Sequence, residues 1–476
     1  MNHSPASLLL DVGGQSVLAL ALDDQWRIRF ESRQSVSTQE LDDRVELDPD
    51  ELAEALQTLV RKACAALGTP GHNHRLRVAL AVQRGSVVCW DAETTKALSP
   101  VLSWRDRRCP DELRSLADKA HIIRELTGLR YSPYAGAPKL AWLLQHAPAV
   151  QTAARQERLV CGPLGSFLTA RLTRHRHALV DHTLAQRTLL WSARKLDWDR
   201  SLLDLFGLPA KALPQVVTSS RHYGRLQLPS CNADLDLLIG DQNCLPFMDG
   251  GPDPDSLYIN LGTGAFLLRP TPQRIDDERF QTTLLDERRD QWALEASVHG
   301  CASALNWLQR THQVHAADHD WSETREQVTD PPLFLNRIDG LGSPWWQTQL
   351  APEFTTQADP ASLTTPQRLL AVLESIAFLI RANAEAMQER LGSARRVVIC
   401  GGLSQSATLC ELIADTLQQD LKRLRPVEGT AWGLHCRLHG RALPADCFEQ
   451  VRHRHRPGLL QRYAAWLSRI NNTGAC

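Results

Sequence analysis

The chain has 476 residues, more than the roughly 250–300 that one hydrophobic core usually serves, so its length favours two domains. Hydrophobic residues make up 43% and charged residues 22% of the chain, which is typical of a soluble globular protein. The formal net charge of -1 gives no reason to expect nucleic acid or an anionic membrane as a partner.

The beginning of the sequence and the cysteines bear on the cellular compartment. The opening residues, MNHSPASLLLDVGG, have no charged segment and too short an apolar run for a signal peptide. No stretch approaches the roughly 18 apolar residues of a membrane span. The cysteines are scattered without CxxC spacing, so Cys400, Cys410, Cys436 and Cys447 are expected to be buried small apolar residues. We therefore expect a cytoplasmic protein with no membrane partner.

The first predicted elements form a strand–turn–strand unit. A short apolar strand over residues 7–11 is followed by a glycine-rich turn at residues 13–16 (GGQS) and a second apolar strand over residues 17–22. The same plan recurs at residues 258–268, around a second turn with the sequence GTG. The recurrence suggests two halves of similar construction that present matching turns to one cleft. The alternative is a pair of unrelated hairpins.

Further helices and strands are expected in the first half of the chain. Asp48 is a plausible N-cap, and Pro49 suits the first turn of the helix that follows. A buried strand over residues 76–82 leads through QRGS to another strand. The charged loop SWRDRR at residues 103–108 has a simple interpretation as a solvated turn with surface ion pairs. Residues 132–134 (SPY) are expected to open a helix with leucines on its inner face.

The central stretch, residues 237–266, carries the most informative chemistry. A buried strand over residues 237–239 ends on Gly240-Asp241-Gln242, and a later strand leads into the GTG turn. Glycines let backbone N–H groups approach phosphate oxygens, and the Thr263 hydroxyl adds another donor. A carboxylate facing phosphates is what a phosphoryl transfer needs to accept a proton from an acceptor hydroxyl.

The second half of the chain alternates strands with helices. A strand is expected at residues 292–296, a helix at residues 300–308 and the longest helix at residues 365–391. A buried strand at residues 397–400 runs into two glycines, and a helix is expected from about residue 405. A helix N-terminus beside these glycines would suit a phosphate or nucleotide. The alternation favours an α/β fold with largely buried sheets.

Taken together, these motifs resemble the FGGY family of carbohydrate kinases, and within it the glycerol kinases most of all. The resemblance covers nearly the whole chain in the family's order. The motifs that carry it are DVGGQS from Asp11, QRGSVVCWD from Gln83, LSWRDRR from Leu102, TGLRYSPYAGAPKLAWLL from Thr127, DHTLAQRTLLW from Asp181, LDWDRSLLDLFGLP from Leu196, GDQ from Gly240, NLGTGAFLL from Asn260, ALEASVHGCASALNWL from Ala293 and CGGLSQS from Cys400.

The resemblance implies a fold and an activity. The fold would be α/β, with two actin-like (ribonuclease H-like) domains and a nucleotide cleft between them. Residues 1–248 would form the N-terminal domain, with the substrate pocket, the catalytic aspartate and the first phosphate turn. Residues 249–476 would form the C-terminal domain, with the second phosphate turn and the adenosine site. With ATP and Mg²⁺ as cofactors, the protein would phosphorylate a hydroxyl of a small polyol or ketose sugar, and it could form a homodimer.

The resemblance also implies roles for individual residues. Asp241 would be the general base that accepts the proton of the substrate hydroxyl as it attacks the γ-phosphate. Asp11 would hold Mg²⁺ through water, because Mg²⁺ keeps several of its waters. The pocket for the small polyol would consist of Arg84, Gly85, Trp104, Tyr134, Asp241, Gln242 and Phe266. The nucleotide would be bound by Gly13, Gly14, Gln15, Ser16, Gly262, Thr263, Gly264, Ala302, Asn306, Gly401, Gly402 and Ser406.

The chain departs from the glycerol kinase pattern at several positions. Gly85 replaces an acidic residue, which removes an acceptor for a substrate hydroxyl and is expected to leave room. A missing partner for a buried hydroxyl costs about 1–3 kcal/mol, enough to move the preference away from glycerol. The first turn has Gly14 where the family has a threonine. Cys400 stands where an acid is frequent, and Ser406 aligns with an asparagine near the adenine edge.

Other interpretations of these residues remain open. Trp104 and Phe266 could be core aromatics, Tyr134 a packing residue at a helix start, and Asp241 a turn residue at a strand end. For the whole protein, the altered first turn leaves a nucleotide-binding regulator with little kinase activity as an alternative. A sugar-binding structural module is a third possibility, disfavoured because both acidic strand ends are present.

Overall fold

The structure of the chain is a computed structural model. It describes residues 6–67, 75–174, 177–227, 232–328, 330–348, 350–355, 362–426 and 428–472.

Contacts within the chain define two compact units. The first half of the chain forms most of unit 1, which also takes in two short segments from the second half. Unit 1 comprises Met1–Gly251, Thr283–Gln291 and Thr430–Ala442. Unit 2 comprises Pro252–Thr282, Trp292–Gly429 and Leu443–Cys476.

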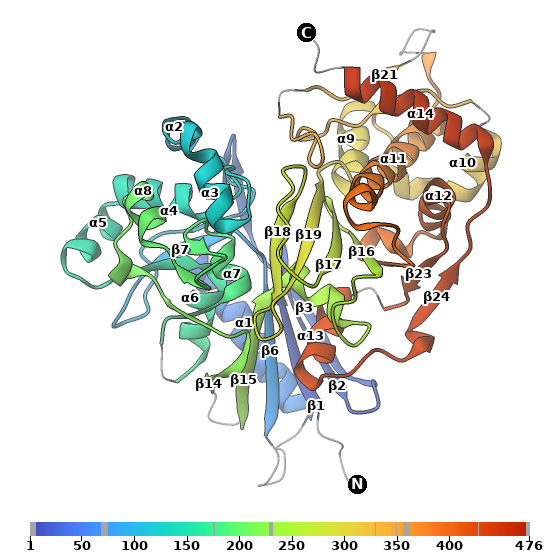
Figure 1. The fold of residues 1–476 in the computed structure, drawn as a ribbon. Helices are drawn as coiled ribbons and strands as arrows, with labels where there is room; N and C mark the ends of the chain where they lie inside the picture. The colour runs from blue at the N-terminus through green and yellow to red at the C-terminus, as the bar shows by residue number, and fades with distance from the viewer. Residues whose placement is uncertain are drawn as a thin grey trace. The chain divides into compact units, whose positions relative to one another are not determined.

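Unit 1 is organised around a six-stranded sheet in the order β14-β15-β6-β1-β2-β3 (Figure 1). β1 pairs antiparallel with β2 and parallel with β6, and β6 pairs parallel with β15. The interiors of β1, β2 and β6 are nearly continuous buried apolar runs, as expected for central strands that are covered on both faces, whereas β3 and β14 at the sheet edges are largely polar. Their bounds are β1 (Ala6–Val12), β2 (Ser16–Asp23), β3 (Ile28–Ser35), β6 (Leu76–Val82), β14 (Ser220–Arg225) and β15 (Ala233–Gly240).

Unit 1 also contains smaller sheets and most of the shorter helices. A five-stranded sheet has the order β4-β5-β8-β7-β9, and two strand pairs, β10 with β13 and β11 with β12, complete the strands. These strands are β4 (Thr38–Leu41), β5 (Arg44–Leu47), β7 (Val87–Asp91), β8 (Val101–Leu102), β9 (Leu159–Pro163), β10 (Leu179–Asp181), β11 (Trp191–Ser192), β12 (Asp197–Trp198) and β13 (Gln215–Val217). The helices are α1 (Pro49–Leu67), α2 (Pro110–Ser115), α3 (Ala120–Thr127), α4 (Gly136–His146), α5 (Pro148–Arg155), α6 (Leu164–Leu172), α7 (His182–Gln186), α8 (Arg200–Phe206) and α13 (Gly429–His439).

Unit 2 contains most of a seven-stranded sheet in the order β18-β19-β17-β16-β22-β23-β24, of which β18 belongs largely to the Thr283–Gln291 segment of unit 1. A small pair, β20 with β21, lies outside it. The strands are β16 (Ser256–Leu261), β17 (Ala265–Thr271), β18 (Gln281–Asp286), β19 (Gln291–Val298), β20 (Leu333–Leu335), β21 (Glu353–Thr355), β22 (Arg396–Cys400), β23 (Leu421–Leu424) and β24 (Phe448–Val451). The helices are α9 (Ala302–His312), α10 (Trp321–Gln327), α11 (Thr365–Leu391), α12 (Ala407–Leu417) and α14 (Pro457–Asn471).

The two large sheets share one pairing scheme. In unit 2, β16 pairs antiparallel with β17 and parallel with β22, and β22 pairs parallel with β23. This is the scheme of β1 with β2, β6 and β15 in unit 1. In each sheet the glycine-rich turn joins the first two strands. The prediction of two similarly built halves is therefore confirmed, and the alternative of unrelated hairpins is wrong.

Several predicted helix boundaries agree with the structure. Asp48 caps α1, because its carboxylate accepts hydrogen bonds from the backbone N–H groups of Asp50 at 2.8 Å and Glu51 at 3.2 Å. The longest helix, α11, covers the residues predicted from its apolar pattern and begins with a capping box formed by Thr364 and Gln367. Capping side chains within the first turn therefore determine where both helices begin.

Two helices begin a few residues later than predicted. α4 begins at Gly136 instead of residues 132–134, because the first helical N–H groups donate to backbone carbonyls of a distant segment, Arg187 and Thr188. A short 3₁₀ helix, η6 (Gly402–Gln405), separates the two glycines from α12. The N-terminus of α12 therefore does not lie directly after the glycines.

Within the described ranges, no helix is long and apolar enough to cross a membrane.

Candidate active site

The predicted base lies where β15 ends and the short 3₁₀ helix η3 (Asp241–Phe247) begins. The Asp241 side chain is 23% exposed, so its carboxylate can meet a ligand. Arg84 Nε lies 3.5 Å from Asp241 Oδ1, and the Gln242 side-chain amide donates to Asp241 Oδ2 at 3.2 Å. Three side chains assigned to the acceptor pocket from sequence therefore gather at one strand end in unit 1.

Arg84 is held by groups that the sequence did not single out. Its aliphatic stem packs against Gly240, where an added Cβ would lie 2.7 Å from Arg84 Cδ. Its guanidinium donates from Nη1 to Asn243 Oδ1 at 3.2 Å, and the Asn243 amide in turn donates to the backbone carbonyl of Leu284 at 2.7 Å. Asn243 lies two residues after the predicted base, and no sequence pattern marked it.

The space beside Gly85 differs from the expectation. Gly85 has φ +78°, and a Cβ added to it would lie 2.6 Å from the Tyr134 carbonyl oxygen and 3.3 Å from Trp104 Cβ. The expectation that Gly85 leaves room for a larger acceptor is therefore wrong at this point, because the Tyr134 backbone fills the space. The Trp104 and Tyr134 rings lie close together, with centroids 6.2 Å apart.

A fully buried lysine lies beneath these residues. Lys139 in α4 has no exposed surface, and its Nζ donates to the carbonyl oxygens of Gly85 at 3.1 Å and Tyr134 at 3.3 Å. Burial lowers the pKa of Lys139 to about 7, although the nearby Asp106 carboxylate opposes the shift. Lys139 thus joins two backbone segments of the predicted acceptor pocket. The signal that could have revealed it was a lysine beside Leu140 on the apolar face of a predicted helix.

The charged loop before α2 is only partly a solvated turn. Asp106 is fully buried, and its carboxylate accepts hydrogen bonds from the Val45 backbone N–H at 2.7 Å and from the Arg108 guanidinium at 2.6 Å. Arg105 and Arg107 do form surface ion pairs with partly exposed acids. The interpretation as a solvated turn is therefore wrong for Asp106 and Arg108, which form a buried ion pair in the loop that carries Trp104.

The first glycine-rich turn closes the β1–β2 hairpin in unit 1. The Gly13 backbone N–H donates to the Ser16 carbonyl at 3.0 Å, and the Ser16 hydroxyl accepts a hydrogen bond from Arg33 Nη1 at 2.9 Å. Asp11, near the end of β1, is half-buried. The turn is thus a well-ordered hairpin bend, and its Ser16 hydroxyl already has a protein partner.

Asp11 and Asp241 influence the same buried thiol. Burial raises the pKa of Cys244 well above its usual value, and the Asp11 and Asp241 carboxylates raise it further. Both acids stand at the carboxyl ends of parallel strands of this sheet, where open α/β sheets bind ligands.

The donor set at this strand end suits Mg²⁺. Carboxylate oxygens are the hard ligands that Mg²⁺ prefers, and one or two carboxylates with phosphate oxygens and water commonly complete its shell. Among the residues the structure describes, no group of three or more acidic, histidine or cysteine side chains could hold a metal by itself. A carboxylate here fits an ion whose other ligands come from a nucleotide and from water, and the role of Asp11 as that ligand stays a prediction.

The second turn is built into the start of a helix in unit 2. The Gly262 N–H donates to the Gly264 carbonyl at 2.9 Å and closes the turn. The first N–H groups of α9 donate to the turn, from Ala302 to the Gly262 carbonyl at 3.2 Å and from Ser303 to the Thr263 carbonyl at 3.0 Å. The turn carbonyls are thereby occupied, and the exposed Thr263 side chain is left at the surface of the turn.

The Gly401-Gly402 pair lies next to this turn within unit 2. β16 and β22 are parallel and paired through Asn260 and Cys400, so both turns follow the carboxyl ends of neighbouring strands. Gly401 has φ +94° and packs against Asn260 and the backbone of Leu261. Gly402 has open space beside its Cα, so it is accessible to a ligand.

Three other predicted contacts belong to unit 2. Ser406 caps α12, since its hydroxyl accepts a hydrogen bond from the Leu409 N–H at 3.2 Å. Asn306 is exposed on α9, and Phe266 is half-buried on β17. Phe266 therefore lies in a different unit from the remaining predicted pocket residues. The roles of all three remain predictions.

The architecture places the protein in a known structural class. Two sheets with one shared pairing scheme, each flanked by helices, form the two-domain actin-like α/β fold. Residues 6–254 match the N-terminal domain of the FGGY family of carbohydrate kinases, and residues 257–436 match the C-terminal domain of the same family. The chain therefore belongs to the FGGY family of carbohydrate kinases.

Individual relatives support this assignment. The chain is 27% identical to the glycerol kinase of Acinetobacter baylyi over 438 residues, which is 90% of this chain and 88% of that protein. Its structure is similar to that of Plasmodium falciparum glycerol kinase with ADP, with a TM-score of 0.84, 19% identity and 99% coverage of both chains. It is also similar to xylulose kinase from Lactobacillus acidophilus, with a TM-score of 0.83 and 16% identity over 98% of this chain and 97% of that one.

The Lys139 environment predicts a pH-dependent stability. Above a folded-state pKa of about 7 the native protein holds Lys139 neutral, while the unfolded chain keeps this lysine protonated up to its ordinary value of 10.5. The unfolded state then binds more protons, so rising pH favours the folded state. The quantity to compare is the free energy of unfolding of the wild type minus that of Lys139→Met. This difference should rise between pH ~7 and ~9, with a slope approaching about 1.4 kcal/mol per pH unit.

Urea unfolding at several pH values measures this slope. Lys62→Met, which removes an exposed lysine of α1, is the matched control and should show no slope. A pH-independent difference for Lys139→Met would contradict the lowered pKa.

The close approach of Tyr134 to Gly85 makes a second prediction. Gly85→Ala forces a side chain into a left-handed conformation, at about 1–2 kcal/mol, and drives its Cβ against the Tyr134 carbonyl. Gly207→Ala, at φ +65° with nothing within 4 Å, bears only the conformational cost. Chemical denaturation should therefore show a larger loss of stability for Gly85→Ala than for Gly207→Ala. Equal losses would mean that the Tyr134 backbone does not restrict this position.

Proposed function

We propose that the protein is an ATP- and Mg²⁺-dependent kinase that transfers the γ-phosphate to a hydroxyl of a small polyol or ketose sugar. The observation that carries this proposal is the partly exposed Asp241 carboxylate at the end of β15, held beside Arg84 and Gln242. The family membership supports the reaction class, and the relatives named glycerol kinase and xylulose kinase suggest the range of acceptors.

Asp241 would act as the general base. Arg84 Nε lies 3.5 Å from the Asp241 carboxylate and would hold it in place to accept the proton. Arg84 and Gln242 carry donors that could orient acceptor hydroxyls so that one points at Asp241. In phosphoryl transfer, positioning and charge neutralisation supply most of the rate enhancement, and the base completes the site.

The nucleotide would be bound by the glycine-rich turns. In unit 2, the Thr263 hydroxyl and the open surface at Gly402 are suited to phosphate oxygens. In unit 1, Asp11 would hold Mg²⁺, which when bound neutralises the developing phosphate charge. The crystal structure of Plasmodium falciparum glycerol kinase with ADP has the same fold, which supports nucleotide binding by this chain.

Glycerol is not expected to be the best acceptor. Position 85 provides no carboxylate, and its backbone carbonyl is already an acceptor for Lys139 at 3.1 Å. A buried substrate hydroxyl that lacks its partner costs about 1–3 kcal/mol. The acceptor panel should therefore include ketoses and longer polyols besides glycerol.

An acceptor screen with ADP release as the readout tests the proposal. The wild type should turn over at least one polyol or ketose with MgATP. Asp241→Asn should lower kcat on that acceptor roughly 10²–10⁴-fold, because the amide cannot accept the proton. ATP affinity, measured by calorimetry, should remain near the wild-type value because the substitution leaves the turns intact.

Asp111→Asn, on a side chain with 83% exposure in α2, is the matched control and should retain wild-type turnover. Near-normal turnover by Asp241→Asn would remove Asp241 as the base. ATP binding without turnover on any acceptor would overturn the kinase proposal itself.

A further inference from the structure

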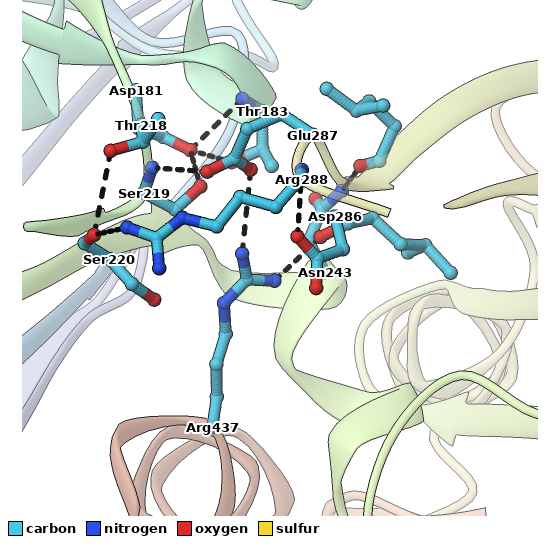
Figure 2. A network of polar contacts seen from close by, with 12 residues as sticks. Asp181, Thr183, Thr218, Ser219, Ser220, Asn243, Asp286, Glu287, Arg288 and Arg437 are labelled. Carbon is cyan, nitrogen blue, oxygen red and sulfur yellow. Dashed lines mark hydrogen bonds and ion pairs between the residues drawn. The ribbon is translucent and has the colours of Figure 1, made fainter. Parts of the chain in front are cut away.

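Asp181 is a buried carboxylate that is linked through one residue to β15, the strand that precedes the proposed base. Asp181 is the last residue of β10 and caps α7, and it has no exposed surface. Four donors surround it: the Thr183 N–H at 2.9 Å, the Thr183 hydroxyl at 2.6 Å, the Leu184 N–H at 3.2 Å and the Ser219 hydroxyl at 3.0 Å. Figure 2 shows Asp181, Thr183 and Ser219 pointing toward one another.

The Thr183 hydroxyl links this carboxylate to β15. A hydroxyl has one proton, and Thr183 donates it to Asp181 Oδ2. Its lone pairs are left for acceptance, and the Gly240 backbone N–H donates to Thr183 Oγ1 at 2.8 Å. Burial raises the pKa of Asp181 to about 6, so near neutral pH the carboxylate is ionised and accepts the Thr183 proton. Because the acceptor is charged and buried, it polarises the hydroxyl and strengthens the bond to Gly240.

The Gly240 backbone contacts both sides of the predicted acceptor site. Asp241 is the next residue, so the backbone at Gly240 sets the direction of the proposed base. The Arg84 stem packs directly on Gly240, where an added Cβ would overlap Arg84 Cδ and Cγ at 2.7 and 2.8 Å. A shift of the Gly240 backbone would therefore displace both the base and the arginine beside it.

Ser219, which donates to Asp181, is itself bonded to a second set of buried groups. The Ser219 N–H donates to Glu287 Oε1 at 3.1 Å, and Arg437 lies 3.6 Å from Glu287 Oε2, with both of these side chains almost fully buried (Figure 2). Glu287 and Arg437 come from the two segments of the second half of the chain that belong to unit 1. Asp181 thus has hydrogen-bond donors on both sides, and three of the four, from Thr183 and Leu184, do not depend on the Ser219 hydroxyl.

We propose that Thr183 is a positioning residue, whose hydroxyl anchors the Gly240 backbone and thereby places Asp241 and Arg84 for the phosphoryl transfer. The inference rests on the proposed function, because it assigns Thr183 a role through Asp241. Thr183 itself touches neither acceptor nor nucleotide in this scheme. A displacement of about 1 Å at a reacting group can cost roughly 100-fold in rate.

Kinetics on the best acceptor separates positioning from a purely structural role. Thr183→Val replaces the hydroxyl with a methyl of similar size and should lower kcat by about 10- to 100-fold. The KM for ATP should change less than threefold, because the turns of unit 2 are not altered. Thr183→Ser keeps the hydroxyl and should restore kcat to within a few-fold of the wild type. Should Thr183→Val not fold, Thr183→Ala removes the hydroxyl without placing a methyl against Asp181.

Two control variants test whether the loss of any buried hydroxyl would lower kcat. Thr169→Val removes another fully buried threonine hydroxyl, which donates to the Gly165 carbonyl at 2.8 Å in α6. Ser219→Ala removes one donor from Asp181 but leaves the Thr183–Gly240 bond in place. Both variants should keep kcat near the wild-type value. If they lower kcat as much as Thr183→Val does, Thr183 is merely structural and the proposal is overturned.

Hydrogen exchange gives a readout that needs no turnover. In the folded protein, the Gly240 amide should exchange faster in Thr183→Val than in the wild type, and at the wild-type rate in Thr183→Ser. Unchanged protection in Thr183→Val would overturn the anchoring, whatever the kinetics. If the wild type uses no acceptor at all, the proposed kinase function fails, while the exchange rates still decide whether Thr183 anchors Gly240.

Discussion

The end of strand β15 depends on one backbone junction, at Gly240. On one side the Gly240 N–H donates to the Thr183 hydroxyl at 2.8 Å, and on the other the Arg84 stem packs against its Cα. A side chain at this position would exclude Arg84, so only glycine allows both contacts. The direction of the Asp241 carboxylate follows from this junction, since Asp241 is the next residue.

The predicted acceptor pocket in unit 1 also depends on a buried polar group. Burying an ammonium without partners is costly, yet Lys139 has no exposed surface. Two backbone carbonyls, of Gly85 and Tyr134, accept its hydrogen bonds, and Asp106 lies near enough to raise its pKa against the effect of burial. Through these two hydrogen bonds Lys139 connects two loops that are distant in the sequence. Lys139 therefore links the backbone of the predicted pocket to helix α4.

The repeated sheet explains why glycine-rich turns occur at two distant positions in the chain. In each unit the turn joins two antiparallel strands, and the first of these strands also pairs in parallel with a later one. The turns therefore lie at the carboxyl ends of parallel strands, where backbone N–H groups and helix starts gather. The second turn is bound to the start of α9 through two hydrogen bonds, which gives it a defined shape.

Local patterns in the sequence determined central strands of the two large sheets, the long helix α11, the cap at Asp48 and the family, because periodicity and short motifs depend only on neighbouring residues. The same patterns identified Arg84, Asp241 and Gln242 as candidate site residues. The structure places these three side chains together at one strand end. Only the tertiary structure decided that Tyr134 fills the space at Gly85, that Lys139 lies beneath it and that Thr183 supports Gly240. Gly240 and Thr183 are 57 residues apart, and Lys139 and Gly85 are 54 apart, so no local pattern could record these contacts. They arise because a buried polar group without a partner is costly, and the folded chain supplies most such partners from wherever in the sequence they lie.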